Sequence, residues 1–153
     1  MQFCSLVNAI ASAMGRKAMH EGNQNKIMLI VTLIVAVFTS EVRAQDAAAA
    51  GEKVFAQCRA CHQIGENAKN AVGPILNGLI GRKSGMIEGY NYSDANKNSG
   101  IVWDEAVFAE YIRNPRAKVP GTKMTYAGLT DEKKIQDLIA FLKQYDASGK
   151  RTE

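Results

Sequence analysis

The chain has 153 residues, a formal net charge of +4 and 46% hydrophobic residues, which suits one small domain beside a short targeting segment. The net charge is only mildly basic, and no stripe of interleaved aromatic and basic residues is present. The composition therefore argues against a nucleic-acid binder, and we expect no nucleic-acid partner.

The first 44 residues have the features of an export signal. A basic lead, formed by Arg16, Lys17 and Lys26, precedes an unbroken run of apolar residues and Thr at positions 27–38. Val42-Arg43-Ala44 then places small residues three and one positions before Gln45, as signal cleavage needs. The apolar run is shorter than the roughly 20 residues of a membrane-spanning helix.

We therefore expect a cleaved signal peptide over residues 1–44 and one domain over residues 45–153, located in the periplasm. An uncleaved anchor, which would hold the protein at the periplasmic face of the inner membrane, is the alternative. The lead is long, so translation from Met14 or Met19 also stays open.

The pattern after the cleavage site predicts a helix over about residues 47–61, with Asp46 as N-cap. Its end carries Cys58-Arg59-Ala60-Cys61-His62, a C-x-x-C-H run that attaches haem through two thioethers and ligates its iron through histidine. Positions three apart share a helix face, so Cys58 and Cys61 can reach two vinyl groups on one porphyrin edge. We expect one haem c, covalently bound through Cys58 and Cys61 and ligated by His62.

Two other uses of this cysteine pair are weaker. A zinc site usually has four ligands, and the other Cys and His, Cys4 and His20, both precede the expected cleavage site. A thioredoxin-type dithiol expects a βαβ setting, but no strand-like run surrounds the pair.

Residues 63–102 are rich in glycine and predict loops, with a small helical turn over about Ser93–Asn98. Such a long loop region normally argues against a compact domain. A large, flat prosthetic group resolves this conflict, because loops can wrap around it while it supplies the core that a short chain lacks.

Two further helices follow. The first is predicted over Asp104–Asn114 and stops at Pro115. The second has Thr130 as its expected N-cap, and Gly149 lies just beyond its end. Its apolar stripe, which indicates ordinary core packing, consists of Ile135, Leu138, Ile139 and Leu142.

Haem iron takes two axial ligands, and the chain after the cleavage site has no histidine other than His62. Two methionines remain, Met86 and Met124. Met86 lies in what looks like an exposed turn, whereas Met124 ends the run Val119-Pro120-Gly121-Thr122-Lys123-Met124, whose Pro and Gly favour a defined loop. We expect His62 and Met124 to be the metal ligands; a core methionine, Met86 as ligand or an open site are the alternatives.

These motifs together resemble the class I c-type cytochromes, the small soluble type shared by mitochondria and alphaproteobacteria. The resemblance covers nearly all of residues 50–146 and implies an all-α class I cytochrome c fold, with helices and loops wrapped around one covalently bound haem c. The matching stretches include Gly51–Phe55, the C-x-x-C-H run, Val72-Gly73-Pro74, Gly78–Arg82, Tyr92–Asn98, Trp103, Tyr111, Asn114-Pro115, Pro120–Met124, Ala127-Gly128 and Asp137–Leu142.

The resemblance implies roles for residues near the haem. The Pro74 carbonyl should accept a hydrogen bond from the free ring nitrogen of His62, which fixes the ring and raises its basicity. Arg82, Tyr92 and Trp103 should hold the haem propionates. Without the family, the two aromatic residues could be ordinary core side chains, and Arg82 a surface charge.

It also implies roles for residues further from the attachment site. A polar network near Met124 should contain Asn96, Tyr111 and Thr122. Tyr126 takes the place beside the exposed haem edge that mitochondrial proteins usually give to Phe. The first and last helices should cross where Gly51 and Phe55 pack on Leu138 and Phe141.

Filled axial positions leave no site for a substrate, so we expect an electron carrier and not an enzyme. The resemblance implies a soluble single-haem protein that shuttles one electron between a cytochrome bc complex and a terminal acceptor. That acceptor could be an oxidase, a photosynthetic reaction centre or a periplasmic reductase. A haem peroxidase or a gas-binding haem protein with a labile sixth ligand is the alternative function.

We expect a monomer that meets redox protein partners by transient electrostatic contact, and membranes only through those partner complexes. The candidates for steering it to acidic partners are Lys53, Lys69, Lys83, Lys118 and Lys123. Each of these lysines could equally be an ordinary solvated side chain.

Overall fold

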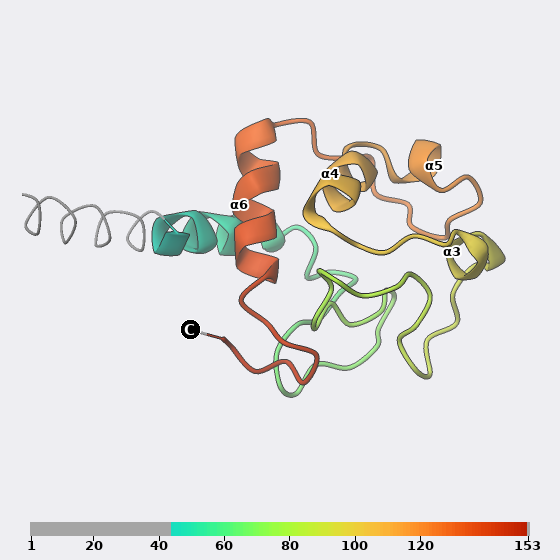
Figure 1. Ribbon diagram of the computed structural model, residues 1–153, viewed down its shortest axis with the longest axis horizontal. Coiled ribbons are helices and arrows are strands. Elements are labelled where there is room, and N and C mark those ends of the chain that lie inside the picture. The colour runs from blue at the N-terminus through green and yellow to red at the C-terminus, as the bar shows by residue number, and fades with distance from the viewer. Residues whose placement is uncertain (1–43, 153) are drawn as a thin grey trace, which may run out of the picture. The chain divides into compact units, whose positions relative to one another are not determined.

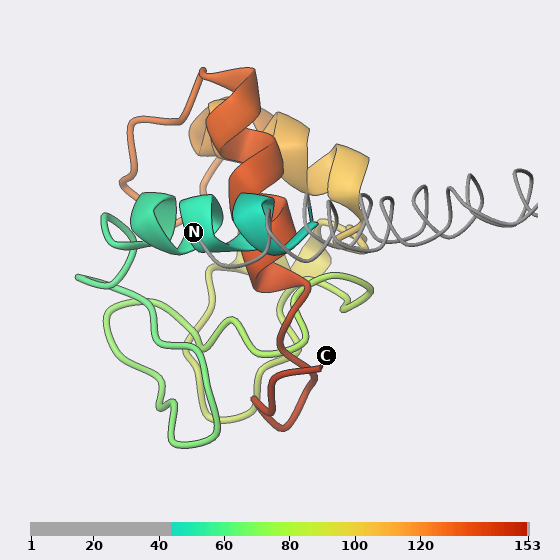
Figure 2. The same ribbon diagram turned by 90° about the vertical axis from the view of Figure 1, so that its left-hand side faces the viewer.

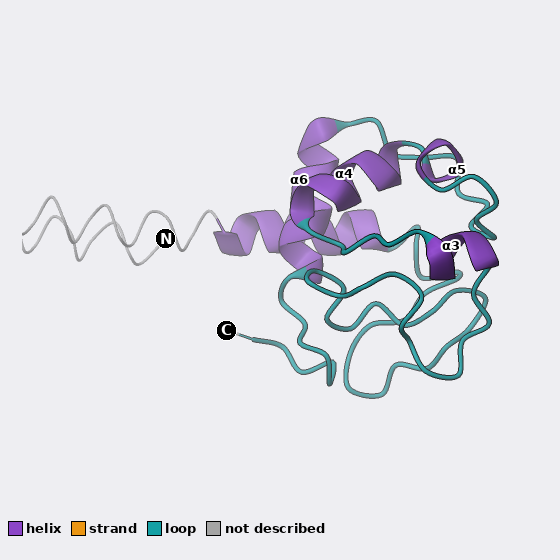
Figure 3. Cartoon of the chain, turned by 45° about the vertical axis from the view of Figure 1, so that its right-hand side comes forward, coloured by secondary structure: helices purple, strands orange, loops and turns teal. Residues whose placement is uncertain are grey.

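The computed structural model describes residues 44–152, in which helices and loops predominate (Figures 1 and 3). The expected signal peptide lies outside this range, apart from Ala44. The only β pairing in the described range is two isolated bridges, so the predicted all-α class is confirmed. The helices are an unlabelled one over residues 44–55, then α3 (Asp94–Asn98), α4 (Glu105–Arg113), α5 (Pro115–Lys118) and α6 (Glu132–Leu142).

The first described helix differs from its prediction at both ends. It is already helical at residue 44, so Asp46 lies inside it and is not the N-cap. Its α-helical stretch ends at residue 55, and residues 56–61 form turns. In these turns Cys58 N donates to Phe55 O at 2.8 Å and His62 N donates to Cys58 O at 2.9 Å. The C-x-x-C-H run therefore occupies a hydrogen-bonded turn after the helix.

Side-chain caps fix the starts of the later helices. Asp104 Oδ1 accepts a hydrogen bond from Val107 N at 2.7 Å at the start of α4. Asp131 Oδ1 accepts from Lys134 N at 3.1 Å at the start of α6, so the predicted cap at Thr130 was wrong by one residue. The helical turn predicted near Ser93 is confirmed as α3, with Ser93 as its N-cap.

The chain after α4 turns once more before it reaches the Met124 segment. α4 ends at Arg113, and the side chain of Asn114 caps the short helix α5, in which Pro115 occupies a first-turn position. Pro115 therefore both ends one helix and starts the next. At the other end of the chain α6 closes at Lys143, well before Gly149, so that glycine does not terminate the helix.

The first described helix crosses α6 at close range (Figure 2). A Cβ atom on Gly51 would lie 1.9 Å from Asp137 O and 2.7 Å from Phe141 Cβ, so only glycine permits this approach. One turn later the rings of Phe55 and Phe141 pack with centroids 5.1 Å apart. Leu138 belongs to the same buried cluster, and the predicted crossing is confirmed.

Long-range backbone hydrogen bonds organise the loops between the first described helix and α4. Gly73 N donates to Cys61 O at 2.8 Å, and Trp103 N donates to Arg82 O at 2.9 Å. These bonds hold the loop region against the helices without regular secondary structure. Among the helices of residues 44–152, none is long and apolar enough to cross a membrane.

The close crossing predicts that Gly51→Ala will destabilise the folded protein by about 2–3 kcal/mol, because the added methyl overpacks against α6. Alanine is the better helix former by about 1 kcal/mol, so the exposed position Ala49 offers a matched control. Ala49→Gly should cost only about that propensity difference. Urea unfolding followed by circular dichroism measures both variants, and a Gly51→Ala protein as stable as the wild type would contradict the crossing.

Candidate functional site

A cavity of about 310 Å³ lies between the helices and the loops, and all eleven of the predicted site residues line it. Met86 does not line it and is 63% exposed, as expected of a turn residue. The structure thus brings residues from the whole length of the domain to one place. The eleven are Cys58, Cys61, His62, Pro74, Arg82, Tyr92, Asn96, Trp103, Tyr111, Thr122 and Met124.

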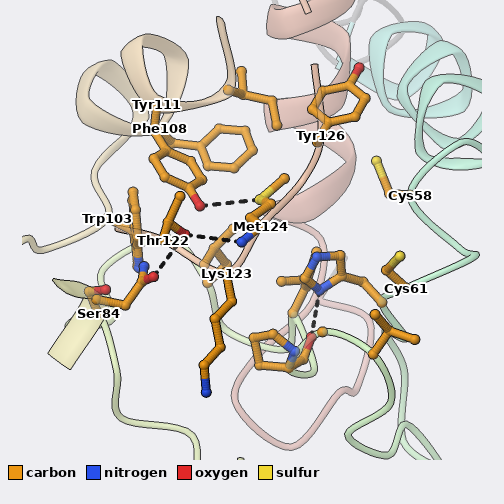
Figure 4. Close-up of a pocket in the computed structure, with 18 of the residues that line it drawn as sticks. Cys58, Cys61, Ser84, Trp103, Phe108, Tyr111, Thr122, Lys123, Met124 and Tyr126 are labelled. Carbon is orange, nitrogen blue, oxygen red and sulfur yellow. Dashed lines mark hydrogen bonds between the residues drawn. The ribbon is translucent and has the colours of Figure 1, made fainter. Parts of the chain in front are cut away.

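Two thiols lie on one side of this cavity (Figure 4). Cys58 and Cys61 are half-buried and are not joined in a disulfide. Burial, with a smaller effect of neighbouring Cys61, raises the pKa of Cys58 to about 11. Cys58 therefore presents a protonated sulfur atom at the cavity wall, and the sulfur of Cys61 follows three residues later.

His62 is oriented as a ligand histidine would be. Its Nδ1 lies 2.7 Å from the carbonyl oxygen of Pro74, so Nδ1 carries the proton and donates. Nε2 then keeps a free lone pair. The backbone of Gly73 lies against the ring, because a Cβ there would come within 2.3 Å of His62 Cε1. Burial lowers the pKa of His62, which favours the neutral ring that binds metals.

Met124 is held by the residues predicted to surround it. Tyr111 Oη donates to Met124 Sδ at 3.2 Å (Figure 4). Met124 N donates to Thr122 Oγ1 at 3.3 Å, and Thr122 Oγ1 donates to Asn96 Oδ1 at 2.9 Å. The loop that carries the thioether is thus tied to α3 and α4.

Arg82, Tyr92 and Trp103 lie close to one another in the lining of the cavity. Two guanidinium nitrogens of Arg82 donate to Asn77 O at 2.6 Å and to Ile75 O at 3.3 Å. Burial lowers the pKa of Arg82 and raises that of Tyr92, so positive charge on this wall is partly desolvated. An anionic group placed here would meet a cation with little competing water.

The structure adds two cavity residues that the sequence did not single out. Ser84 is 3% exposed, and its hydroxyl has no hydrogen-bond partner within the described chain. Gln57 Oε1 accepts a hydrogen bond from Tyr126 Oη at 3.1 Å, which links the turn before Cys58 to the segment after Met124. Neither the burial of Ser84 nor the bond between Gln57 and Tyr126 has a sequence signature, because each depends on segments that meet only in the fold.

The residues present fit a haem. The cavity offers two thiols, a neutral imidazole nitrogen, a thioether sulfur and a cationic wall. No Asp or Glu is among the residues that line it. Within residues 44–152 no group of three or more His, Cys, Asp or Glu side chains could hold a bare metal ion. The Cys58/Cys61 spacing is consistent with covalent haem c.

Comparison with known proteins agrees with this chemistry. The family model described as cytochrome c matches residues 48–146. The chain is 61% identical over 118 residues to cytochrome c2 of Blastochloris viridis, an alignment that covers 77% of this chain and 92% of that protein. It is 62% identical over 103 residues to cytochrome c-550 of Bradyrhizobium diazoefficiens, covering 67% and 76%.

A solved structure of a related protein has the same fold. Cytochrome cH from Methylobacterium extorquens superposes with a TM-score of 0.60 at 51% identity, over 63% of this chain and 97% of that one. The predicted class I fold is therefore confirmed. The chain belongs to the cytochrome c family, with close relatives among the bacterial class I cytochromes, and is an electron carrier rather than an enzyme.

Proposed function

We propose that this protein carries one electron on a single haem c, bound through Cys58 and Cys61 and ligated by His62 and Met124. The observation that supports this most strongly is that a lone-pair nitrogen, a thioether sulfur and two thiols line the same cavity. When bound, the haem iron supplies reversible one-electron chemistry. The protein would supply the two cysteines that attach the haem, the two ligands of its iron and the cavity that surrounds it.

Polar contacts hold the two proposed iron ligands in place, as an electron carrier requires. The Pro74 carbonyl fixes the tautomer and the orientation of His62. Tyr111 fixes the sulfur of Met124, and Thr122 fixes its backbone. Ligands held in this way change position little between oxidation states, so little reorganisation opposes electron transfer. An iron held by both His62 and Met124 would also have no vacant position for a substrate.

The remaining predicted residues would hold the haem periphery. We assign Arg82, Tyr92 and Trp103 to the propionates, because they place a desolvated cation and polar side chains on one wall. Asn96 belongs to the Met124 loop instead, since its Oδ1 accepts from Thr122.

Replacement of Met124 tests this proposal directly. Met124→Ala should abolish the sulfur-to-iron charge-transfer band of the oxidised protein and allow the reduced protein to bind carbon monoxide rapidly. Met86→Ala is the matched control, because Met86 is exposed and does not line the cavity. It should leave both properties unchanged. A wild-type protein that lacks the band, or that binds carbon monoxide readily, would overturn the six-coordinate carrier.

A labile sixth ligand would favour the second candidate function, a peroxidase or gas-binding protein. The hydrogen bond from Tyr126 to Gln57 opposes such lability, because it fastens the segment after Met124 to the turn before Cys58. The bond is exposed to solvent, so its contribution is modest.

We predict that Tyr126→Phe will speed the binding of imidazole to the oxidised protein by about two- to fivefold, the effect of losing one weak hydrogen bond. Gln57→Ala should have the same effect, and the double variant should add nothing further. Tyr145→Phe is the control, because Tyr145 packs on Phe141 and does not line the cavity. Stopped-flow absorbance gives the rates. Equal rates in wild type and Tyr126→Phe would show that the bond does not restrain the loop.

For partners we propose acidic redox proteins, with a cytochrome bc complex as donor and an oxidase, reaction centre or periplasmic reductase as acceptor. Lys53, Lys69 and Lys83 are exposed and form no ion pair within residues 44–152. Lys118 pairs with Glu110, which makes it a weaker candidate. Lys123 is exposed, lines the cavity and donates to Asn91 O at 2.9 Å.

Electron exchange with an acidic partner protein should therefore slow as salt is raised, and Lys123→Gln should reduce both the rate and its salt dependence. Lys134→Gln is the control, because it also removes one positive charge, but from a lysine whose Nζ lies 3.8 Å from Asp131 Oδ2. It should change the rate of electron exchange less than Lys123→Gln does. Flash photolysis at several ionic strengths measures these rates. A rate independent of salt would exclude electrostatic steering.

We also propose export to the periplasm with cleavage after Ala44. In a bacterium that matures c-type cytochromes, N-terminal sequencing of the periplasmic protein should begin at Gln45. Ala44→Leu should block cleavage, because the position before the cut requires a small residue. A membrane-bound product that retains residues 27–38 would instead support the uncleaved anchor.

A further inference from the structure

Ser84 has a buried hydroxyl whose partner the described residues do not supply. The residue is 3% exposed, and its Oγ forms no hydrogen bond within residues 44–152. A buried polar group left unpaired destabilises the folded protein. Ser84 lines the cavity, on the side where Trp103 lies and away from Cys58 and Cys61 (Figure 4).

The backbone holds this hydroxyl in place. Ser84 N donates to Ile101 O at 2.8 Å, and Trp103 N donates to Arg82 O at 2.9 Å. Between these bonds Lys83 and Val102 form an antiparallel bridge. Successive side chains of an extended segment point to opposite faces. Lys83 is accordingly exposed, while Arg82 and Ser84 both face the cavity.

None of the described residues around the cavity accepts a hydrogen bond from Ser84. The side-chain carbonyl of Asn96, which lines the cavity, is already engaged, because its Oδ1 accepts from Ser93 Oγ at 2.8 Å and from Thr122 Oγ1 at 2.9 Å. These two bonds use both lone pairs of that oxygen. No Asp or Glu lines the cavity. A group that fills the cavity can supply the acceptor that Ser84 lacks.

The neighbourhood of Ser84 indicates an anionic acceptor. Arg82 lies on the same face of the same segment. Its guanidinium donates to Asn77 O and Ile75 O, and its remaining N–H groups are available to another acceptor. A neutral acceptor would leave this half-buried cation without a counter-charge. A carboxylate would satisfy the cation and the hydroxyl together.

We propose that the Ser84 hydroxyl donates a hydrogen bond to a propionate carboxylate of the haem, beside Arg82. This inference rests on the proposed haem-binding function and adds a residue to it. The hydrogen bond withdraws negative charge from a carboxylate close to the iron. It therefore favours the reduced state, in which the iron carries less positive charge.

The experiment compares three variants of the full haem-bound protein. Ser84→Ala removes the donor, and Ser84→Thr retains a hydroxyl at the same position. Ser148→Ala is the control, because Ser148 is exposed and its hydroxyl donates to Asp146 Oδ1. Spectroelectrochemistry gives the midpoint potential, and redox-difference infrared spectroscopy with ¹³C-labelled propionates gives the carboxylate stretching bands.

We expect Ser84→Ala to lower the equilibrium constant for reduction by about two- to fivefold and to shift a labelled carboxylate band. Ser84→Thr should restore both properties toward the wild type, and Ser148→Ala should leave both unchanged. Labelled bands and a potential that do not move in Ser84→Ala would overturn the proposal, even if the variant is less stable, because the hydroxyl would then be only structural.

These outcomes are distinct from a failure of the proposed function. Loss of the sulfur-to-iron band in the wild type would remove Met124 as a ligand. The labelled bands would still report whether Ser84 contacts a carboxylate. Conversely, the wild type could show the sulfur-to-iron band while Ser84→Ala leaves the carboxylate infrared bands unshifted. That result would reject the hydrogen bond from Ser84 and leave the proposed electron carrier in place.

Discussion

The structure depends on one constraint: the described chain does not fill its own centre. The helices pack tightly where Gly51 lets the first of them cross α6, but beyond that crossing they and the loops enclose a cavity of about 310 Å³. A domain of this size cannot afford to lose much core. A large apolar group that supplies the missing contacts explains why so many loop residues are ordered around an interior with so little regular structure.

The two sides of the cavity differ in chemistry, and this difference orients whatever fills it. The side with Cys58 and Cys61 can form covalent bonds, whereas the side with Ser84 and Trp103 offers a hydroxyl (Figure 4). Arg82, hydrogen-bonded to Trp103 through the backbone, adds a cation to the lining. A haem has the matching asymmetry, with vinyl groups at one edge and carboxylates at another. Attachment and electrostatics would therefore select the same orientation, and Met124 would meet the iron from a loop tied to α3 and α4.

Much of the site could be predicted, because some of its residues form a contiguous motif and others belong to a short list of possible iron ligands. The C-x-x-C-H run is contiguous, and Met124 emerged by elimination from a small set of possible ligands. The remaining positions came from the family resemblance. Helix ends were less accurate: Asp131 rather than Thr130 caps α6, since the side chain that reaches Lys134 N decides the start. The pairing of Gln57 with Tyr126 could not be predicted, because it exists only once distant segments meet.

The central claim, that a covalently attached haem completes the core, is tested most directly by the mass of the unfolded protein. Mass spectrometry of the mature protein, after treatment with acid and organic solvent and then with a thiol-alkylating reagent, should show the polypeptide plus one haem. It should also show no alkylation at Cys58 or Cys61. A polypeptide that loses its haem on unfolding, or that takes up the reagent at these two cysteines, would contradict the account.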